Sequence, residues 1–154
     1  MPHCRSAGQA EWWHHARRSF LAPRRPAAQR LRRALERGPH SIYAHIGRIG
    51  SHPVGPPFAR FYSVDPEFDF EVGLPVPEPI ARLGRIVPSE LPGGEVAVAE
   101  HRGADTSAAY GELRAWIEAN GREAAGMPWE VSYSDPQEVP DPADWRIEVV
   151  WPIR

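Results

Sequence analysis

Two segments of the chain, GPPFARFY at residues 55–62 and GMPWEVSY at residues 126–133, repeat one pattern 71 residues apart. Each segment is preceded five residues upstream by a further glycine, Gly50 or Gly121. Glycines in such a pattern favour tight turns, and the aromatic residues favour a packed core. The sequence therefore predicts two copies of one structural module.

The repeat continues after an insertion of six residues, where FEVGLPV at residues 70–76 aligns with IEVVWPI at residues 147–153, now 77 residues apart. The second copy reads as strand, helix, strand and strand, whereas the leading strand is not evident in the first copy. We therefore expect an α+β fold. Two tandem strand–helix–strand–strand modules, about residues 26–83 and 84–154, would form one curved antiparallel sheet with the helices on one face.

The N-terminal part of the chain differs from the rest in charge. Residues 1–48 hold ten arginines and two acidic residues, a net charge of +8, whereas residues 49–154 hold eight arginines and eighteen acidic residues, a net charge of −10. Residues 1–25 show neither alternation nor a helical stripe, so we expect a basic, disordered arm there and a folded domain over residues 26–154. The arm would interact weakly with the acidic domain, or else contact an acidic protein surface or DNA.

Apolar periodicity places the secondary structure. Helices are expected over residues 27–36, over residues 39–50, and from a cap at Asp105 or Thr106 to Asn120. Alternation and turn residues predict strands at 58–64, 68–76, 84–90, 95–101, 129–134 and 145–151.

Several classes of protein are not expected from this composition. No apolar run approaches the ~18 residues that a membrane-spanning helix needs, and the first residues lack the apolar stretch of a signal peptide. Cys4 is the single cysteine, which indicates the reducing cytoplasm. The histidines lack the ligand spacing of a zinc site and no phosphate loop or nucleophile elbow occurs, so neither metal nor cofactor is expected. Nucleic-acid binding is not expected, because no aromatic residues interleave with the arginines.

Strand parity separates the apolar and polar side chains of the last two strands. Trp129 and Val131 alternate with Glu130, and Val149 alternates with Glu148. We expect the apolar faces of both strands to pack under the helices. Glu130 and Glu148 would then lie together on the opposite face.

The most informative difference between the two copies is Glu130, which stands where the first copy has Ala59. Positions that agree serve the common fold, whereas positions that differ can build a binding site. Either Glu130 is a solvent-facing strand residue, or it belongs to a groove; Glu148 matches Glu71 of the first copy and can equally have a structural role. The groove would collect small, aromatic and charged side chains, namely Ala59, Phe61, Gly73, Ala97, Ala99, His101, Glu130 and Glu148.

Four segments in order, GPPFARFY, LPGGEVAVAEHRG, PWEVSYSDP and DWRIEVVWPI, resemble the GyrI-like family. These are effector-binding domains at the C-terminus of multidrug-sensing transcription regulators, and also separate proteins. The resemblance covers roughly residues 40–154 and implies two strand–helix–strand–strand modules. The chain departs from the family in two places. The family pattern H-x-G-P-Y is replaced by HRGADTSAAY, which lacks the Pro-Tyr pair, and residues 1–25 do not supply the family's first strand.

The resemblance also implies a binding site. In the drug-sensing members a buried glutamate of the penultimate strand meets lipophilic cations among aromatic side chains, and this role is carried to Glu130. Trp145 occupies the place of an aromatic residue that contacts ligand in some members, although its parity puts it on the helix side. The expected ligand-binding residues are Glu130, Trp145, Phe61, Tyr110, Glu148 and His101.

Binding of a lipophilic, cationic or aromatic small molecule by a stand-alone protein, for sensing or sequestration, is the preferred function. The first alternative is a cofactor-independent hydrolase of strained, electrophilic natural products of the cyclopropanoid type, as some members resemble, with Glu130 and Glu148 as general acid and base. The second alternative is a module that modulates gyrase or contacts another protein. Binding is preferred to catalysis.

Overall fold

The computed structural model describes residues 1–7, 12–21, 40–63 and 67–154. The chain divides into two compact units: unit 1 comprises Met1–Ala10 and Pro92–Arg154, and unit 2 comprises Glu11–Leu91. Among the described residues, each unit consists of antiparallel strands with a helix packed on one face. No helix in this part of the chain is long and apolar enough to cross a membrane.

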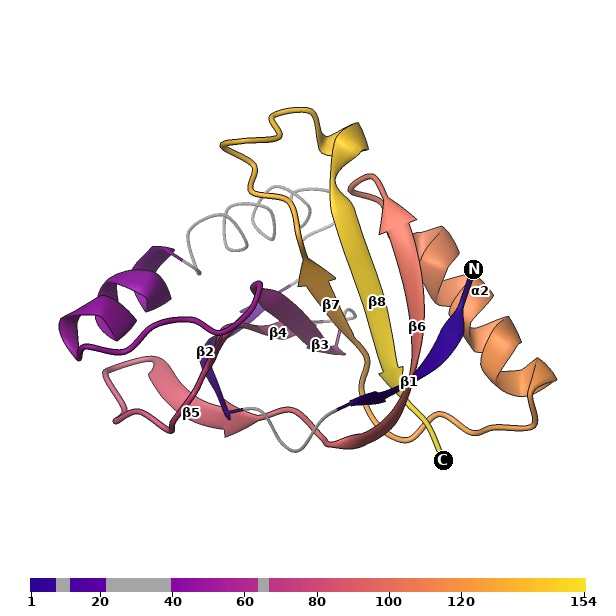
Figure 1. Cartoon of the computed structure of the whole chain (residues 1–154), viewed down its shortest axis with the longest axis horizontal. Helices are drawn as coiled ribbons and strands as arrows, with labels where there is room; N and C mark the ends of the chain where they lie inside the picture. The colour runs from indigo at the N-terminus through magenta and orange to yellow at the C-terminus, as the bar shows by residue number, and fades with distance from the viewer. Residues whose placement is uncertain (8–11, 22–39, 64–66) are drawn as a thin grey trace. The chain divides into compact units, whose positions relative to one another are not determined.

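Unit 1 has the strand order β1-β6-β8-β7. Helix α2 runs beside β6 and β8 (Figure 1). On this face Leu113 and Ile117 of α2 are buried against Ala97, Ala99 and Val149 of the sheet. The elements are β1 (His3–Ala7), β6 (Gly94–Arg102), α2 (Ser107–Ala119), β7 (Trp129–Ser132), a short 3-10 helix η1 (Pro142–Asp144) and β8 (Arg146–Pro152).

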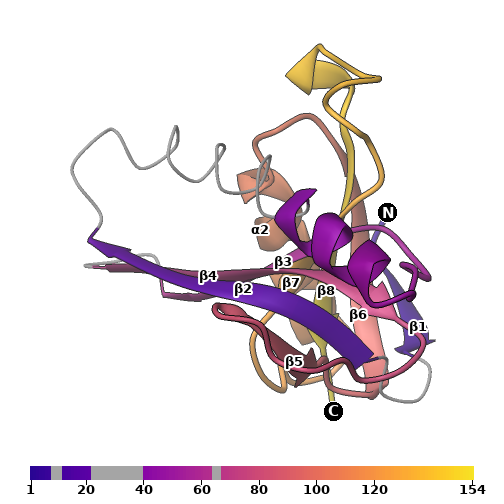
Figure 2. The same ribbon diagram turned by 90° about the vertical axis from the view of Figure 1, so that its left-hand side faces the viewer.

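Unit 2 has the strand order β3-β4-β2-β5. The long strand β2 runs antiparallel to both β4 and β5 (Figure 2). Residues 40–48 are helical, and Ile42 and Ile46 of this helix are buried against Leu74 and Val76 of β4. The strands are β2 (Trp12–Leu21), β3 (Phe58–Ser63), β4 (Glu67–Val76) and β5 (Ile86–Glu90).

The two units repeat one module, as the sequence predicts. Both helices end at the aligned glycines, Gly50 and Gly121, whose φ angles of 72° and 65° lie in the left-handed region that glycine adopts without strain. The two units also share one hydrogen bond: the amide of Val54 donates to the carbonyl of Pro75 at 3.0 Å, and the amide of Ala125 donates to the carbonyl of Pro152 at 2.8 Å. The donors are 71 residues apart and the acceptors 77, so the six-residue insertion lies between them. The predicted α+β fold with strand–helix–strand–strand modules is confirmed. The helix expected at residues 27–36 lies outside the described residues.

The prediction of a disordered arm over residues 1–25 is wrong for two stretches. Residues 3–7 form β1, which pairs with β6, and residues 12–21 form β2, which pairs with two neighbours. Strand β2 supplies the leading strand that the first module seemed to lack. Ladder hydrogen bonds on both sides hold a central strand, and they do not require the alternating pattern that a strand with one solvated face shows.

The sequence predicts correctly which side chains of β8 point toward the helix, and it predicts the opposite of what is found for β7. Val149 lies on the helix face as expected, but its partner in register is Glu130, while Glu148 is opposite Val131. Directly paired residues point to the same face of a sheet, so Glu130 lies on the face that α2 covers and Glu148 on the other. A change of one residue in register reverses every side chain of a strand. Ala97 and Ala99, expected in a groove, belong to the core under α2.

Candidate functional site

Glu130 lies in β7 with its side chain directed to α2. Its Oε1 accepts a hydrogen bond of 2.8 Å from the hydroxyl of Thr106, the residue before the first turn of the helix. The Tyr110 hydroxyl, one turn further along, is near enough to lower the pKa of this carboxyl group as a hydrogen-bond donor. Among the described residues no arginine forms an ion pair with Glu130. Within the described ranges, the one hydrogen bond to this carboxylate therefore comes from a neutral hydroxyl group.

Thr106 reaches Glu130 because it does not cap its own helix. A threonine at this position commonly accepts a hydrogen bond from a free amide of the first turn. Here Thr106 makes no such bond, and Oδ1 of Asp105 accepts from the amide of Ser107 at 3.1 Å instead. The sequence predicts either residue as the cap, and it does not show which of them has another role. Sequence reasoning missed Thr106 as a site residue.

The environment of Glu130 favours the neutral carboxyl group. Burial raises the pKa of Glu130 above its ordinary value of 4.5, while hydrogen bonds from Thr106 and Tyr110 and the charge of His101 oppose that rise. The pKa of the Tyr110 hydroxyl is also raised, first by burial and then by the Glu130 carboxylate, so this group remains a hydrogen-bond donor. Glu130 is thus the kind of buried, shifted acid that binding sites contain.

Two aromatic rings continue the site along α2. Tyr110 meets Trp151 of β8 edge to face, with ring centroids 6.2 Å apart at 74°. The indole N–H of Trp151 donates to the carbonyl of Gly126 at 3.1 Å, which fixes the ring. The Arg114 guanidinium carbon lies 5.7 Å from the centroid of this ring. The Trp151 ring therefore already contacts a cation within the protein, and Trp151 was not among the ligand-binding residues expected from the sequence.

The variant Glu130→Gln is expected to gain stability relative to the wild type as pH rises above 4.5. Because the folded-state pKa of Glu130 is raised above 4.5, the folded protein binds this proton more tightly than the unfolded chain does. Its contribution to stability is complete below pH 4.5 and is lost as pH rises through the raised folded value. Glutamine stays neutral throughout. Urea unfolding of both proteins from about pH 4 to pH 8 measures the difference, and a pH-independent difference would contradict the assignment.

His101 and Trp145 are brought together by the turn after β6. The amide of Gly103 donates to the carbonyl of Trp145 at 2.8 Å, and a Cβ atom built on Gly103 would lie 3.6 Å from Nε2 of His101. Trp145 precedes β8, and its indole N–H donates to the carbonyl of Val139 at 2.8 Å. His101 belongs to the surroundings of Glu130 through its charge. For Trp145 a ligand contact stays a prediction.

Glu148 and Phe61 are not brought to Glu130 within unit 1. Glu148 is buried on the face without α2, where the Tyr133 hydroxyl donates to its Oε2 at 2.9 Å. Phe61 belongs to unit 2 and lies 6.1 Å from Phe70, centroid to centroid. The expectation that Glu130 and Glu148 share a face is therefore wrong. An acid and a base on opposite faces of one sheet cannot flank a single substrate atom and its water, so the geometry does not support that catalytic pair.

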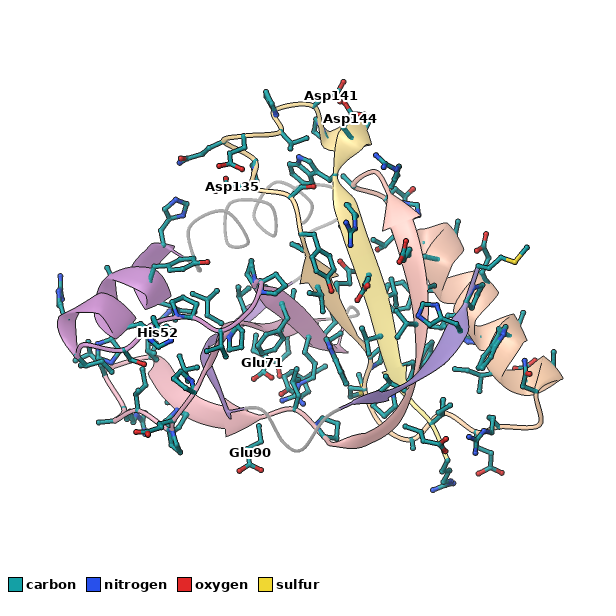
Figure 3. All side chains as sticks on the ribbon, viewed as in Figure 1. His52, Glu71, Glu90, Asp135, Asp141 and Asp144 are labelled. Atoms are coloured by element: carbon teal, nitrogen blue, oxygen red, sulfur yellow. The ribbon has the colours of Figure 1, made fainter. Side chains whose placement is uncertain are left out.

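Two of the acidic side chains between β7 and β8 cap turns. Asp135, Asp141 and Asp144 lie in this connection (Figure 3). Oδ1 of Asp135 accepts from the amide of Gln137 at 2.8 Å, and Oδ1 of Asp141 from that of Ala143 at 2.9 Å. Across the described ranges no three His, Cys, Asp or Glu side chains gather as metal ligands would.

A two-module α+β fold with a half-buried glutamate in its penultimate strand defines the class of protein. Residues 34–154 match the family model described as the GyrI-like small molecule binding domain. The chain belongs to this family, and the resemblance seen in the sequence is confirmed. None of the curated proteins compared with the chain matches it.

Solved structures share the fold at low sequence identity. The C-terminal domain of EcmrR superposes with a TM-score of 0.78 at 19% identity, covering all of this chain and 97% of that domain. The chain spans 57% of EcmrR in its DNA complex, with a TM-score of 0.81 and 16% identity. SAV2435 bound to tetraphenylphosphonium gives a TM-score of 0.66 at 10% identity, covering all of this chain and 94% of that one. A structure described as a hydrolase from Listeria innocua gives 0.65 at 15% identity, with coverage of 99% and 91%.

Proposed function

We propose that this small-molecule binding domain takes up lipophilic cations reversibly, and that the Glu130 carboxylate compensates their charge. The observation that carries the proposal is a half-buried carboxylate that accepts a hydrogen bond from the Thr106 hydroxyl and is ion-paired with no arginine among the described residues. Burying an ionised carboxylate without a cation is unfavourable. A ligand that brings a positive charge to Glu130 removes this unfavourable energy and binds more tightly, whereas a neutral ligand of the same shape does not.

The aromatic groups beside Glu130 support the same class of ligand. Tyr110 links the carboxylate to Trp151 through an edge-to-face contact, so an acidic group and π faces are contiguous. Aromatic rings attract cations by about 0.5–2 kcal/mol each, more when water is excluded. A ligand with aromatic groups around a positive centre can use both features at once. Such a ligand is bound in one structural neighbour, SAV2435 with tetraphenylphosphonium.

The decisive experiment compares two probes of one shape and opposite charge. Tetraphenylphosphonium and tetraphenylborate are titrated separately into the wild type and into Glu130→Gln by isothermal calorimetry near neutral pH. We expect the wild type to bind the phosphonium and to discriminate against the borate. The substitution should weaken phosphonium binding at least about tenfold, because it removes roughly 1.4 kcal/mol or more of charge attraction in a buried setting.

Opposite responses of the two probes separate charge from shape. At pH values above the folded pKa of Glu130, borate binding should become stronger in Glu130→Gln, since the repelling charge is gone. Equal losses for both probes would show that the substitution disturbs packing and that the charge is not recognised. Glu112→Gln on the exposed side of α2 is the matched control, because it removes one carboxylate from the same helix without touching the site.

A further inference from the structure

Glu130 is held by groups that suit both of its protonation states. The Thr106 hydroxyl, 2.8 Å from Oε1, and the Tyr110 hydroxyl donate to an ionised carboxylate. A hydroxyl group also carries acceptor lone pairs, so the Thr106 hydroxyl can rotate and accept from a protonated carboxyl group. An arginine in the same place could only donate, and it would keep the carboxylate ionised at all times.

Unit 2 contains the contrasting case. Glu71 of β4 is buried, with 1% of its side chain exposed, and it is ion-paired with Arg60 of β3. Nε of Arg60 donates to Oε1 of Glu71 at 2.7 Å. In this unit an arginine therefore compensates the charge of a buried carboxylate. At Glu130 the described part of the protein has hydroxyls instead.

We propose that the site exchanges a proton for its cation: the Glu130 carboxyl group is protonated in the free domain and releases its proton to solvent when a lipophilic cation binds. This inference rests on the proposed function and adds its regulation. No other bond changes, and the charge of the buried site is balanced before and after binding. The affinity for a permanent cation then rises with pH, and low pH expels the ligand.

The groups around Glu130 fit this assignment. The neighbouring β8 presents Val149, which carries no charge. Strand β6 contributes His101, whose charge attracts the carboxylate, and the turn before α2 contributes Asp105, which interacts with His101. Helix α2 contributes Tyr110, whose pKa is raised, so it keeps its proton. Burial raises the pKa of Glu130, as proton uptake requires. His101 is therefore the neighbour to replace when the released proton is assigned.

The test is calorimetric titration of tetraphenylphosphonium into the full chain in pairs of buffers that differ in ionisation enthalpy. Release of close to one proton is expected at the acid end of a range from about pH 5 to pH 8, falling as pH rises through the folded pKa of Glu130. Over the same acid limb the affinity should change by about tenfold per pH unit. Tetraphenylborate should show no such release.

Two variants assign the proton. Thr106→Val removes a hydrogen bond that lowers the pKa of Glu130, so the pH midpoint of proton release should move upward. His101→Gln should still release the proton; loss of the release in this variant would overturn the assignment to Glu130. Phosphonium binding without proton release at any pH would overturn the exchange and leave the proposed function intact. Absence of phosphonium binding at every pH would overturn both.

Discussion

Replacement of Arg60 by methionine is expected to lower the free energy of unfolding by about 3 kcal/mol. Glu71 has 1% of its side chain exposed and is ion-paired with Arg60, so the substitution removes the Arg60 guanidinium from a buried carboxylate. Breaking a buried pair from one side costs about 3–5 kcal/mol. A cost near 3 kcal/mol is expected here because the Tyr62 hydroxyl also donates to Glu71. That hydroxyl keeps its proton, since burial and the Glu71 carboxylate raise the pKa of Tyr62 to about 12.

A double substitution separates the charge from the packing. Arg60→Met combined with Glu71→Gln removes both charges and should recover most of the lost stability. The single variant should also lose less at acid pH, because a buried Glu71 without Arg60 can take up a proton. Urea unfolding with an unchanged m-value measures all three effects. A loss below about 1 kcal/mol in the single variant would mean that Arg60 does not hold the charge of Glu71.

The repeat explains why much of the fold could be predicted. Aligned glycines such as Gly50 and Gly121 are required by the left-handed turns that end both helices, and a turn of this kind restricts the residue type strongly. Strand β2 could not be predicted in the same way. Its place depends on backbone pairing with β4 and β5, which lie more than forty residues away in the chain, and backbone groups leave no trace in side-chain patterns.

The site was predictable in its central residue and not in its surroundings. Glu130 stands out because a carboxylate replaces Ala59 in a repeat whose other positions keep their character. Its orientation was mispredicted, since parity within β7 does not say which of two faces meets the helix; the register with β8 decides that. The Thr106 hydroxyl could not be assigned from sequence, because its choice between a helix amide and Glu130 depends on tertiary geometry.

The two units share one fold but carry different charged residues at aligned positions. At the aligned pair of positions 60 and 131, unit 2 has Arg60 beside Glu71, and unit 1 has Val131 opposite Glu148. At the aligned pair 59 and 130, unit 2 has a buried alanine and unit 1 has Glu130 under its helix. In unit 2 the charge of the buried glutamate is thus compensated by an arginine, whereas unit 1 has a glutamate beside α2. This asymmetry is what makes unit 1 the candidate for ligand binding.

Replacement of Leu113 by alanine is expected to destabilise the protein by about 3 kcal/mol and to weaken the cation site with it. Leu113 has no exposed surface and packs in the α2 cluster against Ala97 and Ala99. Those neighbours are short side chains on β6, and they cannot move into the space left by the three carbon atoms that the substitution removes. The cavity would therefore persist, and the loss of stability should exceed the lower limit of about 2 kcal/mol. Urea unfolding measures the loss.

The functional part of this prediction follows from the position of Leu113 on α2. It lies three residues after Tyr110, on the same side of the helix, and Tyr110 with Thr106 holds Glu130. A loosened α2 should therefore reduce tetraphenylphosphonium affinity in protein that is still folded, whereas Glu112→Ala on the exposed side should change stability by no more than about 0.5 kcal/mol. If Leu113→Ala lowered stability as expected but left phosphonium affinity unchanged, the ligand would not depend on α2, and a site at Glu130 beneath that helix would have to be abandoned.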